Sequence, residues 1–246
     1  MDLSGSTALV TGAASGLGAA TAHALAERGV DVLALDLAAP ADPDPRIRYV
    51  AADVTDEEQV AASLAQLTSP LRLVVNCAGI APAVRLLSSK GVHDLAIFRK
   101  TIDVNLVGTF NVLRLAAEVM ATNDPLADGA RGLMVNTASV AAYEGQIGQV
   151  AYAASKGAIV GMTLPAARDL ARYGIRVNTI APGIVLTPLL TALGETVVES
   201  LSASVPFPPR LARPDEYAQL VLMLADHDYL NGETIRMDGA LRMAPQ

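Results

Sequence analysis

Two residues one helical turn apart, Tyr152 and Lys156, could carry out proton transfer. Residues 152–156 read Tyr-Ala-Ala-Ser-Lys, and this spacing puts the phenol and the ammonium on one face of a helix. A free phenol has a pKa near 10, so its use as a base at neutral pH requires about 4 kcal/mol of phenolate stabilisation. A nearby ammonium, a second cation and partial desolvation can supply that energy. Such a pair is common on helix surfaces, so the assignment depends on the residues around it.

Ser139 and Asn105 are the other side chains that could take part in this chemistry. Ser139 follows a predicted strand, and its hydroxyl could donate to a substrate oxygen and help Tyr152 to polarise it. Asn105 lies inside a predicted helix, where asparagine is unfavourable, and its amide could hold a water that links Lys156 to solvent. The histidines are scattered, so Ser139 has no partner for hydrolase chemistry. No cluster of His, Cys, Asp and Glu has metal-ligand spacing, so no metal is expected.

Residues 11–18 read Thr-Gly-Ala-Ala-Ser-Gly-Leu-Gly and separate a predicted strand from a predicted helix. Gly12, Gly16 and Gly18 let the backbone turn tightly and approach a ligand closely. The unpaired N–H groups at the start of the helix can then bind a pyrophosphate. A plain tight turn is the alternative. The strand before it, the helix after it and an acid downstream favour dinucleotide binding.

That acid is Asp36, which ends the second predicted strand. A carboxylate there can accept hydrogen bonds from both adenosine ribose hydroxyls and would repel a 2′-phosphate. Positions 15 and 37 are serine and leucine, so neither supplies a cation for that phosphate, and NAD is expected rather than NADP. A capping or surface role for Asp36 is the alternative. Asp53 and Val54 could hold and cover the adenine, although Asp53 could equally be a turn residue.

Residues 76–79, Asn-Cys-Ala-Gly, end the fourth predicted strand and place small residues beside the cofactor. Cys77 has no cationic or histidine neighbour in sequence, so it is expected to line the site as a packing residue and not to act as a nucleophile. It is the only cysteine, which excludes an internal disulfide and favours a reducing compartment.

Short β-rich runs alternate with longer helical patterns along the 246 residues. Strands are expected at 7–10, 30–35, 47–51, 71–75, 132–137, 175–180 and 234–237. Helices are expected at 17–28, from Thr55 onward, at 103–120, at 151–173 with a bend at Pro165, and at 215–225. This order predicts one α/β domain, residues 1–246, with a doubly wound parallel sheet of the Rossmann type. The irregular stretch 184–213 follows a strand and is expected to be a substrate lid.

The composition of the chain limits the classes of partner that it is expected to bind. Hydrophobic residues make up 52% of the chain, and the formal net charge is −7. A sizeable core is expected, and the negative charge argues against nucleic acid as a partner. No apolar run reaches the roughly 20 residues of a membrane helix, so no membrane partner is expected. The nucleotide-type motif starts at Thr11, which leaves no room for a targeting peptide, and the cytoplasm is the expected location.

Together these motifs resemble the short-chain dehydrogenase/reductase family from end to end of the chain. The matching motifs are the glycine turn, Asp53, residues 76–79, Asn105, Ser139, Tyr152 with Lys156, Pro182-Gly183 and Thr187. The family normally has a second asparagine where Cys77 stands and a glycine where Ala240 stands. Neither departure touches the proton-transfer residues. The resemblance implies further NAD contacts from Ser15, Leu17, Val54, Cys77, Gly79, Pro182, Gly183, Val185 and Thr187.

Longer strings resemble one branch of that family, which uses NAD to interconvert the 3-hydroxyl and 3-keto groups of acyl-CoA thioesters. The strings lie at 136–149, 161–170, 205–211 and 231–243, and this branch shares Cys77 and Ala240. The resemblance implies a homotetramer, Ser139 on the substrate oxygen, and Gln146 and Gln149 beside the substrate. From the sequence alone, the two glutamines could equally be ordinary loop residues.

Other activities remain open. A 3-oxoacyl carrier-protein reductase is one alternative, but Asp36 argues against it because that activity usually uses NADPH. A hydroxysteroid or secondary-alcohol dehydrogenase is another. A nucleotide sensor without catalysis is disfavoured, since such proteins commonly lose Tyr152 or Lys156. A second role in RNA processing is disfavoured by the net charge and by the lack of a basic stripe.

Overall fold

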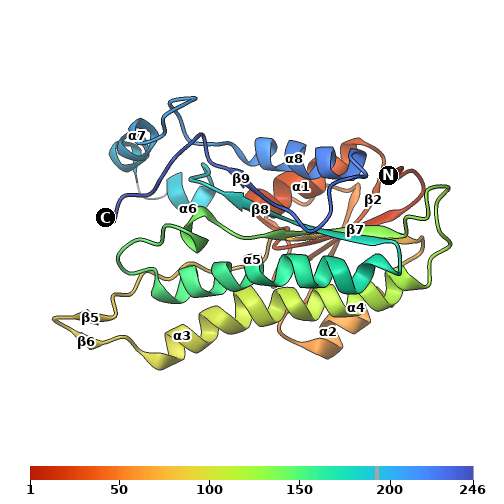
Figure 1. Ribbon diagram of the computed structural model, residues 1–246, viewed down its shortest axis with the longest axis horizontal. Coiled ribbons are helices and arrows are strands. Elements are labelled where there is room, and N and C mark those ends of the chain that lie inside the picture. The colour runs from red at the N-terminus through yellow and green to blue at the C-terminus, as the bar shows by residue number, and fades with distance from the viewer. Residues whose placement is uncertain (192–193, 246) are drawn as a thin grey trace.

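The computed structural model describes residues 1–191 and 194–245 (Figure 1). Within them, seven strands form one parallel sheet in the order β3-β2-β1-β4-β7-β8-β9. They are β1 (Thr7–Thr11), β2 (Asp31–Asp36), β3 (Ile47–Ala51), β4 (Leu71–Asn76), β7 (Gly132–Thr137), β8 (Ile175–Pro182) and β9 (Thr234–Met237). The predicted doubly wound sheet is confirmed. Its strand order reverses between β1 and β4, where open α/β sheets bind their ligands.

Helices cover both faces of this sheet, so the central strands are buried on both sides. On one face, α1 (Gly16–Glu27) and α8 (Pro214–Asp226) pack their apolar side chains against β1, β2, β4 and β7. On the other face, α2 (Glu57–Leu64), α4 (Thr109–Ala121) and α5 (Val150–Ala171) form a second core cluster with the same strands. Figure 1 shows the resulting three layers, with α1 and α8 above the sheet and α2, α4 and α5 below it.

One long helical run lies below the sheet. It joins α3 (Leu95–Ile102), the π-helix η1 (Asp103–Gly108) and α4, so the helix predicted from residue 103 begins at Leu95, where Asp94 caps it. The run spans 27 residues and is long and apolar enough to cross a membrane by length and composition. Charged residues interrupt it at Arg99, Lys100, Asp103, Arg114 and Glu118, so it is not a continuous apolar run, and the absence of a membrane partner stays a prediction. Because α4 contributes to the second core cluster, we interpret the run as a core helix of the domain.

The segment after β8 is more regular than expected. It contains α6 (Pro188–Thr191) and α7 (Glu195–Ala203), so the prediction of an irregular stretch at 184–213 is wrong for these residues. Residues 192–193 of the predicted lid lie outside the described residues. A β-bridge between Val185 and Ala212 joins the two ends of the segment. The segment is thus a loop with its own helices, tied at its base beside β8.

Smaller differences from the predicted elements are local. An unpredicted antiparallel hairpin, β5 (Leu87–Ser88) and β6 (Gly91–Val92), projects from the domain beside α3 (Figure 1). The capping residue of α2 is Asp56, not Thr55, because its carboxylate accepts a backbone N–H of the first turn at 3.0 Å. Helix α5 continues on both sides of Pro165.

Candidate active site

The turn between β1 and α1 has no room for a side chain at two of its glycines. A Cβ on Gly12 would lie 2.7 Å from the backbone nitrogen of Ala78, and one on Gly18 would collide with the carbonyl oxygen of Gly12. Gly12 and Gly16 also have φ angles of 64° and 54°, in the left-handed region that favours glycine. The turn therefore leaves bare backbone facing the start of α1, and this arrangement fits a pyrophosphate.

Asp36 lies beside this turn, at the carboxyl end of β2. Its Oδ2 accepts the N–H of Ala14 at 2.9 Å, and its Oδ1 accepts the N–H of Leu37 at 2.7 Å. A carboxylate has about four acceptor positions, so capacity remains for the hydroxyls of a ribose. Leu37 is 72% exposed and offers no charge there. Among the described residues that line this cavity, Lys100 of α3 is the one with a positively charged side chain.

Asp53 stabilises the turn that follows β3 by accepting hydrogen bonds. Its Oδ1 accepts the N–H and the hydroxyl of Thr55 at 2.9 and 2.7 Å, and these bonds hold the pKa of Asp53 below its usual range. The turn role that the sequence left open is thus present. Asp53 and Val54 also line the same cavity as Asp36, so a contact with the adenine stays a prediction that this placement permits.

Two adjoining cavities bring the predicted cofactor residues together. One, of about 390 Å³, follows the glycine turn, and the other, of about 490 Å³, contains the proton-transfer residues. The shared wall residues are Leu17, Cys77, Gly79, Ile80 and Thr187. The first cavity adds Gly12, Ser15, Gly16, Gly18, Asp36, Asp53 and Val54, and the second adds Ser139, Tyr152, Lys156, Pro182, Gly183 and Val185. Every predicted cofactor residue lines at least one of them.

Three predicted catalytic side chains meet in the second cavity. Tyr152 and Lys156 come from the first turns of α5, and Ser139 follows β7 and caps the short helix η2 (Val140–Ala142). The Ser139 hydroxyl lies near Tyr152 and acts to lower the pKa of its phenol. The Nζ atom of Lys156 lies 5.8 Å from the centroid of the Tyr152 ring and donates to the carbonyl oxygen of Thr137 at 2.7 Å. The sequence spacing therefore does place the phenol and the ammonium side by side.

Burial shifts both of these groups toward their neutral forms. It raises the pKa of Tyr152, and the Ser139 hydroxyl only partly opposes this shift. It lowers the pKa of Lys156 to about 8. The protein alone therefore does not hold a phenolate at neutral pH. A cationic ligand bound beside Lys156 would lower the pKa of Tyr152.

Asn105 lies in η1, and hydrogen bonds within the protein occupy both N–H groups of its side-chain amide. Its Nδ2 donates to the Ile80 carbonyl oxygen at 2.9 Å and to Ser155 Oγ at 3.0 Å, and its Oδ1 accepts the Ile80 N–H at 2.8 Å. A water can therefore bind Asn105 only as a donor to Oδ1. This oxygen and Lys156 Nζ lie 3.1 and 3.7 Å from the point that a Cβ on Gly79 would occupy. The predicted water stays a prediction, now limited to that one oxygen.

The two glutamines expected beside the substrate lie in the loop between η2 and α5. Gln146 Nε2 donates to the carbonyl oxygen of Ala244 at 3.0 Å. Gln149 Oε1 accepts the N–H of Gln146 at 3.0 Å. Neither is among the described residues that line the cavity of Tyr152. Their contact with substrate stays a prediction, and in this structure both amides make contacts within the protein.

Three partners of the site were missed by sequence reasoning. Lys156 is held by the carbonyl of Thr137, and Asn105 by the backbone of Ile80. Backbone acceptors and donors leave no signature in residue types, so no signal could have found them. Lys100 lines the nucleotide cavity from α3, but in the sequence it is one of two adjacent basic residues, and no motif distinguishes it from Arg99.

Cys77 contributes packing to the wall shared by the two cavities. Its Sγ lies 3.7 Å from the hydroxyl of Tyr217, which is completely buried and 2.7 Å from Thr137 Oγ1. Burial raises the pKa of the Cys77 thiol. A neutral thiol is a poor nucleophile, so this environment is that of a packing residue.

Comparison with known proteins places this fold and site in a family. The sequence profile of the short chain dehydrogenases matches residues 6–197. The chain is 52% identical over 248 residues to 3-hydroxyacyl-CoA dehydrogenase type-2 of Drosophila melanogaster, covering 96% of this chain and 97% of that protein. It is 51% identical over 252 residues to the Homo sapiens protein of the same name, covering 98% and 97%. A crystal structure of 3-hydroxyacyl-CoA dehydrogenase type-2 from Mycobacterium avium is 43% identical, with a TM-score of 0.92 and 98% coverage of both chains. The chain therefore belongs to the short-chain dehydrogenase/reductase family of oxidoreductases.

Proposed function

We propose that the protein is an NAD-dependent dehydrogenase that interconverts the 3-hydroxyl and 3-keto groups of acyl-CoA thioesters. The observation that carries the chemistry is the meeting of Ser139, Tyr152 and Lys156 in a cavity that adjoins the one lined by Asp36. The substrate class is supported by the names of relatives that match nearly the whole chain at about half identity.

The residues around the two cavities fit NAD. The glycine turn would hold the pyrophosphate, Asp36 the adenosine ribose, and Lys156 the nicotinamide ribose. When bound, NAD accepts a hydride from the substrate carbon and brings the positive charge of its nicotinamide to the second cavity. That positive charge would lower the pKa of Tyr152, which burial in the protein raises.

The side chains of the protein then transfer one proton. In oxidation, Ser139 Oγ holds the substrate oxygen by a hydrogen bond, and Tyr152 Oη takes the hydroxyl proton. The Lys156 ammonium beside the ring stabilises the phenolate that accepts it. Tyr152 is then neutral. Lys156 would release a proton to solvent through a water donating to Asn105 Oδ1 and take the proton of Tyr152 in exchange, so that both residues return to their starting states. In reduction the same groups act in reverse, with Tyr152 as the acid.

Asp36 supports NAD over NADP. Its carboxylate already accepts two backbone N–H groups, so a negative charge is fixed where a 2′-phosphate would lie. Lys100 lines the same cavity, and its charge helps to lower the pKa of Asp53 at the adenine end. A carrier-protein reductase that uses NADPH would need a cation beside position 36, where the chain has Leu37.

The experiment compares substrates and cofactors in one panel. Initial rates are measured with a 3-hydroxyacyl-CoA, a hydroxysteroid and a simple secondary alcohol, each with NAD and with NADP. We expect the acyl-CoA with NAD to give the highest kcat/KM, by at least about tenfold. A higher value with the steroid or the alcohol overturns the substrate class. A strong preference for NADP overturns the argument from Asp36 and favours the reductase.

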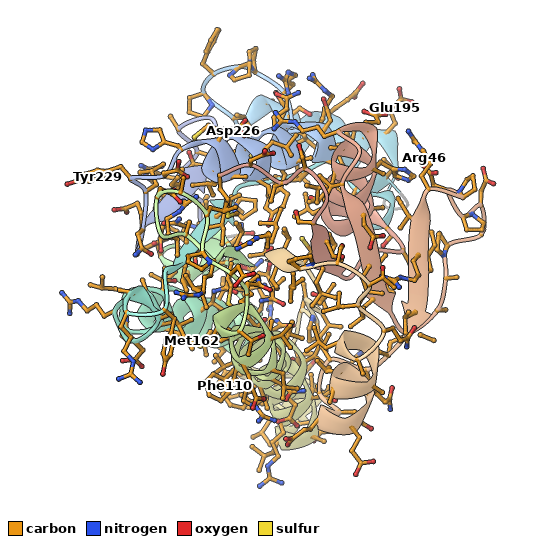
Figure 2. All side chains as sticks on the ribbon, turned by 90° about the vertical axis from the view of Figure 1, so that its right-hand side faces the viewer. Arg46, Phe110, Met162, Glu195, Asp226 and Tyr229 are labelled. Carbon is orange, nitrogen blue, oxygen red and sulfur yellow. The ribbon has the colours of Figure 1, made fainter. Side chains whose placement is uncertain are left out.

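We also propose that the protein is a homotetramer. Four large apolar side chains are exposed on neighbouring helices below the sheet: Val107, Phe110, Val150 and Leu164. Figure 2 labels Phe110 on α4 and Met162 on α5, on this side of the sheet. These side chains are the candidates for contacts between subunits. Light scattering should give four times the chain mass of 25.4 kDa, and Phe110→Asp should lower it. A monomeric wild type contradicts the proposal.

A further inference from the structure

The C-terminal tail, residues 238–245, runs along the loop 143–149 that connects η2 to α5. Three hydrogen bonds join the two segments: from Gln146 Nε2 to the Ala244 carbonyl oxygen at 3.0 Å, from the Ile147 N–H to the Pro245 carbonyl oxygen at 2.9 Å, and from the Met243 N–H to the Glu144 carboxylate at 3.3 Å. The bonds are spread along both segments, so the tail holds the loop over most of its length.

Arg236 of β9 ties the base of the tail to the same loop. Its Nη1 and Nη2 donate to the two carboxylate oxygens of Glu144 at 2.8 and 3.0 Å, and its Nε donates to Asp238 Oδ2 at 2.7 Å. Nη2 also donates to the Leu241 carbonyl oxygen at 3.1 Å. Arg242 approaches both Glu144 and Asp238, at 3.4 and 3.2 Å. One guanidinium thus joins the sheet, the tail and the loop.

This ion-pair network differs from an ordinary surface pair. The side chains of Arg236 and Glu144 are 23% and 22% exposed, and that of Asp238 is 9% exposed. The pair is bidentate, and the guanidinium lies 5.2 Å from the centroid of the Tyr143 ring. Partly desolvated bidentate pairs fix geometry more firmly than the exposed pairs whose median contribution is about 0–1 kcal/mol.

The loop that the network holds lies between the two halves of the proton-transfer centre. It begins after the helix that Ser139 caps and ends at α5, which carries Tyr152. Its last residue, Gln149, accepts the Ala153 N–H at 2.7 Å, so the loop continues directly into the first turn of α5. On its other side, the Gly148 carbonyl oxygen accepts the N–H of Val84 at 2.9 Å. The position of the loop therefore depends on the tail at one edge and on Val84 at the other.

We propose that Arg236 is a positioning residue, which through Glu144 and the C-terminal tail fixes loop 143–149 between Ser139 and Tyr152 and so sets how the substrate is held there. The identity of the substrate rests on the proposed function, whereas the anchoring of the loop does not. Arg236 lies outside the described linings of both cavities, so it touches neither the cofactor site nor Tyr152. Its loss should weaken substrate binding and leave the chemical step largely intact.

The kinetic test uses Arg236→Ala, Arg236→Lys and a matched control, Arg28→Ala. Arg28 pairs with Asp226 on the far side of the domain, with side chains 47% and 57% exposed. Arg236→Ala should raise KM for a 3-hydroxyacyl-CoA roughly tenfold, with kcat changed less than about twofold and the Kd for NADH unchanged. Arg236→Lys should recover part of the loss, and the control should match wild type. An unchanged KM overturns the proposal, as does an equal loss of kcat and NADH affinity.

A second readout needs no substrate. Hydrogen exchange is measured over 143–149 in wild type, in Arg236→Ala and in a chain that ends at Met243. Both variants should exchange faster at Ile147, roughly tenfold or more, while β2 keeps its protection. Unchanged exchange at Ile147 overturns the positioning role whatever the substrate is. Faster exchange at Ile147 in a protein whose wild type ignores acyl-CoA would instead refute the proposed function and leave the positioning role standing.

Discussion

The nucleotide half and the proton-transfer half of this site are built in different ways. Gly12, Gly18 and Asp36 come from one β1-α1-β2 unit, and they act through bare backbone and one carboxylate. The proton-transfer half collects side chains from distant segments, and burial shifts the pKa of both Tyr152 and Lys156. Backbone shape sets the first half, and side-chain environment sets the second. Substitutions should therefore separate cofactor binding from turnover.

The separation of cofactor binding from turnover is tested first in the glycine turn, where the largest change in NADH affinity is expected. A Cβ at position 18 would collide with the Gly12 carbonyl oxygen, so Gly18→Ala must displace the turn. An overpacking cost of up to about 3 kcal/mol corresponds to a roughly 100-fold weaker NADH affinity. Fluorescence titration with NADH measures it. Gly161→Ala is the matched control, because a Cβ there meets nothing within 4 Å. Equal affinities in the two variants would show that the turn does not bind the cofactor.

A smaller effect should sharpen the role of Asp36 within the nucleotide half. Hydrogen bonds to a charged group contribute about 1.5–3 kcal/mol, so Asp36→Ala should lower the preference for NAD over NADP by roughly 10- to 100-fold. The preference is the ratio of the two kcat/KM values. Asp36→Asn keeps the shape without the charge and should fall between Asp36→Ala and wild type. A preference that stays at the wild-type value in both variants contradicts the assignment.

The smallest expected effect concerns the proton-transfer half without any ligand. Burial lowers the pKa of Lys156 from 10.5 to about 8, so between these values the unfolded chain holds a proton that the folded protein has released. The wild-type apoprotein should therefore gain unfolding free energy relative to Lys156→Met as the pH rises through this window. The gain is at most about 1.4 kcal/mol per pH unit.

Urea unfolding of both proteins across that pH window measures the difference. Lys100→Met removes an exposed lysine and controls for the lost charge. If the wild-type and Lys156→Met stabilities run parallel with pH, burial does not shift Lys156, and the electrostatic contrast between the two halves fails.

The same contrast explains what could be predicted from the sequence. Strands such as β7 and β9 have their predicted bounds, because apolar runs between polar turns define them locally. The glycine turn, Asp36 and the Tyr152–Lys156 pair depend on spacing within one or two elements, and the structure places them around adjoining cavities. Local patterns suffice wherever the structure that they specify is local.

The rest depended on contacts between distant segments. Lys156 and Gln146 donate hydrogen bonds to the carbonyl oxygens of Thr137 and Ala244. Every residue has a carbonyl oxygen, so residue types do not reveal such partners. The helices within 184–213 were missed because several prolines there indicated irregular structure, whereas Pro188 opens α6. The early start of the helix at Leu95 depends on the cap formed by Asp94, a single side-chain contact that the apolar pattern does not show. Long-range partners and short capped helices lie beyond periodicity arguments.

The most direct test of the central claim is Tyr152→Phe, which removes one oxygen atom from the proton-transfer centre. Two quantities are measured in the same preparation: kcat for 3-hydroxyacyl-CoA oxidation with NAD, and the Kd for NADH. The account predicts a fall in kcat of about 10²- to 10⁴-fold, as expected for loss of a general acid–base, with the Kd within about twofold of wild type. Undiminished turnover, or a loss of turnover that merely follows a loss of NADH affinity, would contradict it.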